Sequence, residues 1–332
     1  MITMTEIARL TGVSQPTVSR VLNGNQAVNP EIRERVLACA REYNFQPNVI
    51  ARSLAGSKTM LLGLVFTDIS NSFFADLEKL LEQEAKKSGY SVIVFNSDYD
   101  WNREKECLDV IRRYRVDGLI IVPVEENSEK FRSQMKSLDI PAVALTRKTE
   151  HMDCVYVDHV EAGGQVGRHL REQGCDSYVF VGTEKDGKYE GFTEALREMV
   201  PDLETRLIRI ETKNPGEIRR TLRRHFENCP GKTGIFAYND RRAVQIHGIL
   251  QGLGIEVPGR ACLMGFDNTY ICDYLYPGLS SVAQSNEEMA AKAVSRLLWK
   301  IEHPEDTEII KEPIRARLIA RQSSAAVEED KS

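Results

Sequence analysis

The chain has 332 residues, a length typical of two or three domains, and its 42% hydrophobic content is enough for buried cores. Its 49 acidic and 44 basic residues give a formal net charge of −5, which excludes a protein that coats DNA along its whole length. The charge is uneven, because residues 1–58 carry seven Lys and Arg against four acidic residues, or +3, and leave −8 for the rest. A small basic end on an acidic body suits a protein with one DNA-facing end.

Several classes of protein are disfavoured by what the sequence lacks. The seven cysteines are scattered without a C-x-x-C pair, so we interpret them as reduced packing residues. No apolar run approaches the roughly 18 residues of a membrane span. The N-terminus does not have the pattern of a signal peptide, so we expect a cytoplasmic protein without a membrane partner. The sequence shows no metal-ligand cluster, nucleophile elbow or P-loop, so we predict no enzymatic activity, no catalytic residue, no metal site and no cofactor.

Residues 3–22 predict two short helices joined by a tight turn. Thr3 and Glu6 have the spacing of a capping box, Gly12 can end the first helix, and Ser14 can cap the second. The apolar residues expected to face inward are Ile7, Ala8, Leu10, Val18, Val21 and Leu22. The second helix then presents a polar, Arg-bearing first turn, which is what a DNA major groove accepts.

A third helix is predicted from Asn29-Pro30, an N-cap followed by a proline at the first helical position, to Tyr43. Three helices at this spacing indicate a small helix-turn-helix module, and a plain three-helix bundle that binds no nucleic acid is the alternative. Pro47 ends the third helix, and a brief hinge helix follows through Leu54. A helix this short is marginal alone in water and needs a partner helix or DNA to support it.

From residue 61 the pattern changes to strands alternating with helices. The unbroken apolar run 61–66 fits a strand buried on both faces. Further strands are predicted at 90–95, 118–122 and 140–145, and the theme restarts at 155–157, 178–181, 234–237 and 262–266. This alternation indicates parallel sheets with helices on both sides, and two such blocks indicate two lobes with a cleft between them. The glycines at 163, 164 and 167 lack nucleotide-binding spacing, so we interpret them as a site of close helix packing.

About twenty N-terminal positions resemble the lactose-repressor (LacI/GalR) family of bacterial transcription regulators, in the motif T-x-x-E-I-A-x-x-x-G-V-S-x-x-T-V-S-R-V-L-N. Further matches are F-Q-P-N at 45–48, A-R-S-L at 51–54, D-I-S-N-S-F-F at 68–74, V-D-G at 116–118, N-D at 239–240, G-F-D-N at 265–268 and L-I-A-R at 318–321. The resemblance covers nearly the whole chain. It implies an N-terminal all-α helix-turn-helix head with a hinge helix. It also implies an α/β two-lobed, periplasmic-binding-protein-like core with parallel sheets, crossed by the chain near 158, 284 and 313.

We therefore divide the chain into a helix-turn-helix DNA-binding domain, a hinge, an effector-binding and dimerisation core, and a disordered tail. These parts are expected at 1–45, 46–58, 59–323 and 324–332. Lobe 1 of the core is expected at about 59–158 and 285–312, and lobe 2 at about 159–284 and 313–323. The tail is polar and acidic and carries no leucine heptads, so it predicts no tetramer-forming coiled coil.

In the second helix Arg20 is the expected base reader, because its planar fork can donate two hydrogen bonds to guanine. Gln15 can pair with adenine or a phosphate, whereas Pro16 offers only an apolar contact. The resemblance implies phosphate contacts, and a hinge leucine that enters the minor groove as a wedge. The predicted DNA-binding residues are Ser14, Gln15, Pro16, Thr17, Ser19, Arg20, Asn23, Asn48, Ala51, Arg52 and the wedge Leu54.

In the core Asp267 is the leading candidate, since it ends a buried strand and ligands bind beyond the carboxyl ends of strands in open α/β sheets. A carboxylate there can accept hydrogen bonds from adjacent sugar hydroxyls. Lys188 stands where many relatives carry Arg, and Thr146 where some carry Asp, so a known effector does not transfer. The predicted effector-binding residues are Phe73, Phe74, Arg147, Lys188, Phe236, Asn239 and Asp267. Core packing is the alternative for the aromatic members of this set.

Together these patterns predict a sequence-specific DNA-binding transcription regulator, a repressor, that acts as a homodimer on double-stranded operator DNA. A small hydroxylated effector (a sugar, sugar acid or sugar phosphate) is expected to bind between the lobes and to alter DNA affinity. The main alternative is a transport-type sugar-binding protein, whose core would look the same, and the helix-turn-helix head argues against it. An enzyme is a more distant alternative, because no catalytic constellation is present.

Overall fold

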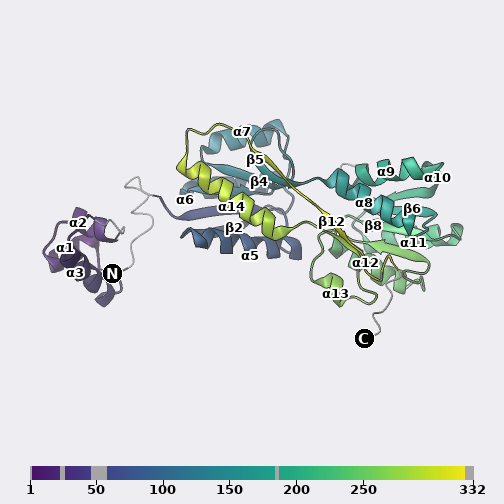
Figure 1. The fold of residues 1–332 in the computed structure, drawn as a ribbon, viewed down its shortest axis with the longest axis horizontal. Coiled ribbons are helices and arrows are strands. Elements are labelled where there is room, and N and C mark those ends of the chain that lie inside the picture. Colours follow the sequence, from purple (N-terminus) through teal and green to yellow (C-terminus); the bar gives the residue numbers. More distant parts are fainter. Residues whose placement is uncertain (1, 23–26, 46–57, 184–186, 326–332) are drawn as a thin grey trace. The chain divides into compact units, whose positions relative to one another are not determined.

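The computed structural model describes residues 2–22, 27–45, 58–183 and 187–325. The chain separates into two compact units, Met1–Thr59 and Met60–Ser332, each with its own hydrophobic core (Figure 1). An all-α head followed by an α/β core with parallel sheets confirms the predicted fold class. The predicted hinge helix lies outside the described residues.

The head consists of helices α1 (Met4–Thr11), α2 (Gln15–Leu22) and α3 (Pro30–Glu42). The capping box is present, since Glu6 N donates to Thr3 Oγ1 at 3.2 Å and Thr3 N donates to Glu6 Oε2 at 2.8 Å. Gly12 ends α1 in the left-handed conformation at φ +67°. The small core gathers Ile7, Val18 and other apolar side chains from all three helices. Leu10 was expected in this core but is 50% exposed, because α1 turns that side away from both neighbours.

Lobe 1 of the core is built on a parallel sheet of order β11-β5-β4-β3-β1-β2. Its strands are β1 (Leu61–Phe66), β2 (Ser91–Asn96), β3 (Gly118–Ile121), β4 (Ala142–Thr146), β5 (Asp153–Val157) and β11 (Lys311–Ile314). Helices α5 (Ser72–Lys87) and α14 (Asn286–Glu302) bury their apolar sides against one face. Helices α6 (Trp101–Tyr114) and α7 (Glu129–Leu138) cover the other. The sheet is thus buried on both faces, as its continuous apolar strands require.

Lobe 2 repeats the plan with a parallel sheet of order β7-β6-β8-β9. Its strands are β6 (Ser177–Val181), β7 (Leu207–Ile210), β8 (Thr233–Ala237) and β9 (Ala261–Met264). Helices α8 (His159–Glu172) and α9 (Gly187–Met199) cover one face, and α11 (Pro215–Asn228) and α12 (Asp240–Gln251) the other. The short helices α10 (Leu203–Arg206) and α13 (Ile271–Tyr274) lie in connections.

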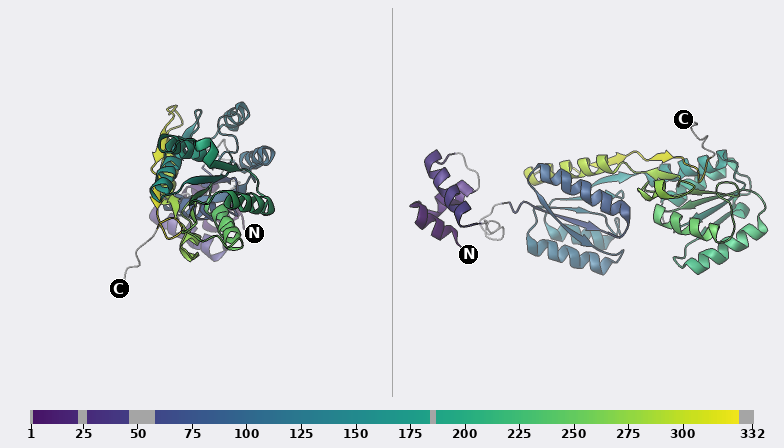
Figure 2. Two further views of the ribbon diagram at one scale, coloured as in Figure 1. Left: turned by 90° about the vertical axis from the view of Figure 1, so that its right-hand side faces the viewer. Right: turned by 90° about the horizontal axis from the view of Figure 1, so that it is seen from below.

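The chain passes between the lobes three times. It leaves the first sheet after β5, returns through β10 (Ser281–Ala283) into α14, and leaves again after β11 into β12 (Arg317–Ile319). Strands β10 and β12 pair antiparallel. Figure 2 shows this C-terminal segment, in yellow, running along one edge of the core from the first lobe to the second. These three crossings connect the two lobes.

The prediction of disorder from residue 324 is wrong for the residues that the structure describes there. Ser323 and Ser324 are completely buried. Ser323 Oγ donates to the Leu263 carbonyl at 2.6 Å, and Ser324 Oγ lies 2.7 Å from His169 Nε2. Small polar residues can be buried in this way when their hydroxyls find partners at a strand edge. Residues 326–332 lie outside the described part.

The predicted close packing of α8 is confirmed at its glycines. A Cβ on Gly163 would stand 2.1 Å from the Lys188 carbonyl oxygen, and one on Gly191 would stand 1.7 Å from the Val160 carbonyl oxygen. No side-chain rotation can relieve contacts with backbone atoms. The absence of Cβ atoms therefore lets α8 approach the first turn of α9, which carries Lys188.

Gly163→Ala is accordingly expected to destabilise the core by about 1–3 kcal/mol, because the two helices must separate. The matched control is Gly248→Ala, on the exposed side of α12, where nothing lies within 4 Å of the added methyl. That change should be neutral, or stabilising by up to about 1 kcal/mol. Equal unfolding midpoints for the two variants in urea would contradict the packing argument.

Candidate effector cavity and DNA-facing helix

A cavity of about 290 Å³ lies between the two lobes of the core. It is lined where parallel strands of both sheets end, because Thr67 follows β1, Thr146 ends β4, and Asp267 follows β9. Four helices, α5, α8, α9 and α12, also begin at its wall, so their positive dipole ends face it. This is the place at which open α/β sheets bind ligands.

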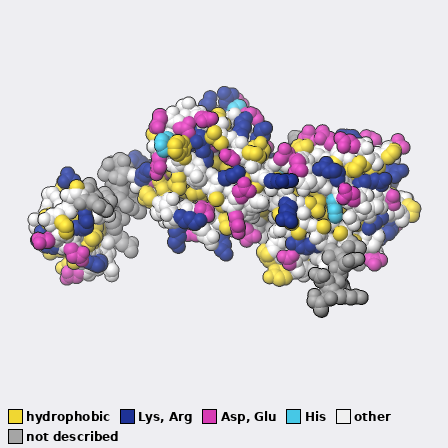
Figure 3. All heavy atoms as spheres, in the orientation of Figure 1, with side chains coloured by type: hydrophobic (Ala, Val, Ile, Leu, Met, Phe, Trp, Pro, Cys, Tyr) yellow, Lys and Arg dark blue, Asp and Glu magenta, His cyan; other side chains and the backbone are white. Residues whose placement is uncertain are grey.

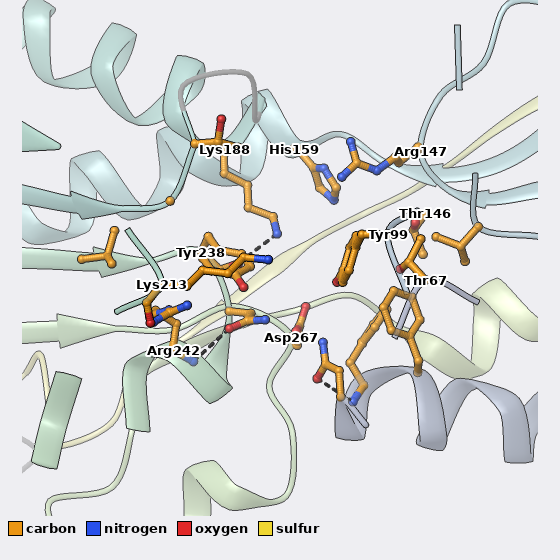
Figure 4. A pocket seen from close by; sticks show the side chains of 18 of the residues that line it. Thr67, Tyr99, Thr146, Arg147, His159, Lys188, Lys213, Tyr238, Arg242 and Asp267 are labelled. Carbon is orange, nitrogen blue, oxygen red and sulfur yellow. Dashed lines mark hydrogen bonds between the residues drawn. The ribbon is translucent and has the colours of Figure 1, made fainter. Parts of the chain in front are cut away.

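Asp267 lies in the middle of this cavity (Figure 4). Its side chain accepts a hydrogen bond from Gln284 Nε2 at 2.6 Å, and the nearby Asn71 side chain lowers its pKa. Burial raises the pKa of Asp267 to about 8, with Asp240 adding to the rise and Lys188 opposing it. The residue also has a left-handed backbone, at φ +107°. Strain of this kind costs on the order of 1–3 kcal/mol and is concentrated at functional sites.

Lys188 and Arg147 line the cavity as predicted, and both are held by protein groups. Lys188 Nζ donates to the Tyr238 carbonyl at 3.0 Å and lies 4.0 Å from the centre of the Phe266 ring. Arg147 Nη1 lies 3.4 Å from Glu126 Oε1. Lys188 reaches the cavity from α9, and Arg147 reaches it from the end of β4.

Asn239 lines the cavity, but only part of its amide is left for a ligand. Its Oδ1 caps α12 by accepting from Arg242 N at 2.9 Å. The Nδ2 group remains as a donor. Asn71 is divided in the same way, since its Oδ1 accepts from Phe73 N at 3.2 Å while its amide faces Asp267.

The three aromatic residues predicted to bind the effector do not all line the cavity. Phe73 and Phe74 line the cavity from the first turn of α5, with ring centres 5.1 Å apart. The prediction for Phe236 is wrong, because its ring is 0% exposed and does not line the cavity. It packs against Phe180 and two further aromatic rings under α8 and α9. A residue in the middle of a doubly buried strand has no access to the cleft.

The structure adds lining residues that the sequence did not single out. They include Thr67, Asn71, Tyr99, His159, Lys213, Tyr238, Arg242 and Gln284. Asn71 lies within the D-I-S-N-S-F-F motif, and Tyr238 directly precedes Asn239. Both could have been predicted from the sequence, because each follows the end of a strand. Lys213 and Arg242 gave no such signal, because isolated basic residues usually mark a solvated surface.

In the head, α2 buries Val18 and Val21 and turns its other side to solvent. Gln15, Pro16 and Arg20 are exposed, whereas Thr17 and Ser19 are half-buried. Ser14 Oγ lies 2.9 Å from Thr17 Oγ1, so these hydroxyls already interact at the start of the helix. The other predicted DNA contacts, Asn23, Asn48, Ala51, Arg52 and Leu54, lie outside the described residues.

Comparisons with known proteins show which family the chain belongs to. The family model of bacterial regulatory proteins, lacI family, matches residues 3–48, and that of a periplasmic binding protein-like domain matches 168–324. The chain is 32% identical over 310 residues to catabolite control protein A of Staphylococcus xylosus, which covers 92% of this chain and 94% of the relative. This chain belongs to the lacI family of bacterial regulatory proteins. The resemblance found in the sequence is thus confirmed.

Two solved structures have a fold similar to that of this lacI-family chain. One is the lac repressor dimer bound to operator and the anti-inducer ONPF, with a TM-score of 0.82, 21% identity, and coverage of 98% of this chain and 99% of that one. The other is a LacI family transcriptional regulator from Enterococcus faecium with bound ribose, with a TM-score of 0.69, 26% identity, and coverage of 81% and 100%. The first likeness shows the shared fold.

Neither a metal site nor a membrane-spanning helix is found among the described residues of this lacI-family chain. No group of three or more His, Cys, Asp or Glu side chains there could hold a metal ion. No described helix combines the length and apolar character that a membrane crossing needs. On the face of the core shown in Figure 3, basic and acidic side chains are interspersed.

Proposed function

We propose that this lacI-family chain is a sequence-specific transcription regulator, a repressor, whose affinity for operator DNA is controlled by a small hydroxylated effector in the core cavity. The observation that carries this is the combination in one chain of a helix-turn-helix head matching the family with a polar cavity between two lobes. The cavity alone would fit a transport-type binding protein equally well, and the head is what favours a regulator.

The head supports the DNA half of this proposal. The exposed side of α2 offers Gln15 and Arg20 beside the half-buried hydroxyls of Thr17 and Ser19. Side chains of these types read base edges or hold phosphates when a helix enters the major groove. The exposed Arg20 guanidinium is the group that we assign to a guanine.

The core supports the effector half. Asp267 and Asn239 belong to lobe 2, and Phe74 and Arg147 to lobe 1, so one ligand in the cavity touches both lobes. The lobes also meet directly, since Arg241 Nη1 lies 3.2 Å from Asp68 Oδ2 and 2.9 Å from Ser70 Oγ. A ligand that favours one spacing of the lobes can shift a two-state equilibrium, and such coupling is typically worth ~1–3 kcal/mol.

We also propose that the protein acts as a homodimer on a near-palindromic operator, because a two-fold symmetric dimer binds two matching half-sites. The lac repressor, which has a similar fold, is a dimer in its structure with operator. Exposed large apolar side chains gather around α13, at Tyr270, Tyr274 and Tyr276, the last two 80% and 87% exposed. Contiguous exposed aromatic groups mark contact surfaces. Sedimentation should give twice the 37.6 kDa chain mass.

The testing experiment selects operator DNA from a random duplex library with the full chain, then measures affinity by fluorescence anisotropy. We expect a near-palindromic consensus and an affinity that falls steeply with salt, because phosphate contacts release counterions. A panel of sugars, sugar acids and sugar phosphates is then titrated into the complex, and at least one should change the affinity about 5–150-fold. Recovery of no consensus sequence would contradict the proposed function.

A further inference from the structure

The described side chains that line the cavity include more cations than carboxyl groups. Among the described residues that line it, four are cations, Arg147, Lys188, Lys213 and Arg242, and two are carboxyl groups, Glu211 and Asp267. Glu211 is itself engaged, since its Oε1 lies 3.2 Å from Arg209 Nε. The helix N-termini at the wall add partial positive charge.

Two of the four cations are already compensated inside the protein. Arg147 faces the carboxylate of Glu126 at 3.4 Å. Lys188 is buried, donates to the Tyr238 carbonyl, and lies near enough to Asp267 to oppose the rise in that residue's pKa. An anionic ligand group gains least at these two positions, because it would compete with existing partners.

The other two cations are positioned but not neutralised. Neither Lys213 nor Arg242 forms an ion pair with any carboxylate within the ranges that the structure describes. Lys213 Nζ lies 5.6 Å from the centre of the Tyr99 ring, and the Arg242 guanidinium lies 5.9 Å from the centre of the Tyr238 ring. Arg242 Nη1 also donates to the Lys213 carbonyl at 3.4 Å and to Gln245. A fork held in this way is ready to accept an anion with little loss of side-chain freedom.

The side-chain oxygen of Gln284 indicates that the ligand also carries hydrogen-bond donors. Gln284 lines the cavity and is 3% exposed, and its Oε1 has no hydrogen-bond partner among the described residues. Its Nε2 is used by Asp267. A buried acceptor without a partner costs about 1–3 kcal/mol unless a ligand donates to it. Hydroxyl groups supply such donors.

Figure 4 shows Lys213 and Arg242 on one side of Asp267, and Thr67, Tyr99 and Thr146 on the other. We propose that the effector is a sugar derivative with an anionic group, a phosphate monoester or a carboxylate, which Lys213 and Arg242 bind while its hydroxyls meet Asp267 and Gln284. This deepens the proposed function and rests on it. It places the anion on the lobe 2 side, away from Arg147.

The first test compares matched ligands by calorimetry on the full chain: glucose with glucose 6-phosphate and gluconate, and ribose with ribose 5-phosphate. The anionic member of at least one set should bind at least about tenfold more tightly than its neutral partner. The double variant Lys213→Gln, Arg242→Gln should lose that advantage, so that it binds the anionic and neutral members of the set with similar affinities. A preference confined to phosphates or to carboxylates identifies which anion the site takes.

The second test uses inorganic phosphate alone, so it does not depend on guessing the sugar. Phosphate should raise the thermal midpoint of the wild type more than sodium chloride at equal ionic strength, because it binds only the folded site. The gain should vanish in the Lys213→Gln, Arg242→Gln variant. It should persist in the control Arg223→Gln, Arg224→Gln, which removes the same charge from the exposed side of α11.

Absence of a phosphate-specific gain in the wild type, or its equal loss in both double variants, would overturn the anionic site. Operator binding separates this outcome from a failure of the proposed function. A neutral sugar that shifts operator affinity as strongly as its phosphate ester contradicts the anionic site and leaves the regulator intact. Loss of specific operator binding in every condition contradicts the regulator itself.

Discussion

Above about pH 8, where Asp267 is ionised, Asp267→Asn is expected to weaken effector binding at least about tenfold, because it removes the charged acceptor in the middle of the cavity. A hydrogen bond to a charged group is worth ~1.5–3 kcal/mol. Operator binding without effector should stay near the wild-type value, since Asp267 lies in the core unit and α2 in the head. Calorimetric titration of both proteins with the ligand found in the screen gives the comparison.

The same residue predicts a pH dependence of effector affinity. With its pKa raised to about 8 by burial, Asp267 is mostly protonated at pH 7 in the effector-free protein. If hydroxyls bind the carboxylate form, effector affinity should rise with pH and level off above about 8, with proton release on binding at pH 7. The Asn variant should show neither trend. An identical pH profile for both proteins would remove Asp267 from the effector site.

Stability should change in the opposite direction from binding. Because the folded-state pKa of Asp267 exceeds the ordinary value of 3.8, the folded state holds more protons than the unfolded state between about pH 4 and pH 8. The free energy of unfolding therefore falls as the pH rises through that window. Asp267→Asn should not show this loss, so its stability relative to the wild type should rise between pH 5 and pH 8. Asp76→Asn on the exposed side of α5 is the control and should show no such divergence.

Arg20→Ala should cost ~1–3 kcal/mol in affinity for the selected operator and relax the preference at one base pair per half-site. Arg20 is exposed on α2, opposite the buried Val18 and Val21, so its removal should leave the head folded. Anisotropy on the consensus operator, on single-base variants and on random duplex measures the effect.

The control for Arg20 is Arg41→Ala, which removes the same charge from α3, where the guanidinium lies 2.5 Å from Glu34 Oε1. That variant should retain the base preference. If Arg20→Ala instead weakens consensus and random DNA equally, Arg20 contacts a phosphate and the assignment to a base is wrong.

Much of the fold could be predicted because its signals are local. The capping box at Thr3 and Glu6, the left-handed Gly12, and the apolar run of β1 each follow from a few neighbouring residues. Asp267 could be placed for a similar reason, since a carboxyl directly after a buried strand lies at the edge where parallel sheets bind ligands.

The remainder depends on contacts between distant segments. The sequence predicts Phe236 in the cavity wall, but its ring is enclosed by the packing of α8 and α9. Lys213 and Arg242 resemble ordinary surface cations in the sequence, and only the meeting of the two lobes places them beside Tyr99. Ser324 looked like the start of a loose tail, but its hydroxyl finds Ser280 and His169 across the core.

We propose that one chain couples an operator-binding head to an effector cavity. The most direct test of this coupling measures effector affinity by calorimetry twice, with the free protein and with the protein saturated by its operator. Linkage requires operator to change effector affinity by the same factor as effector changes operator affinity, which we expect to be about 5–150-fold. Coupling between the two sites predicts a change in either direction. Equal effector affinities with and without operator would contradict it.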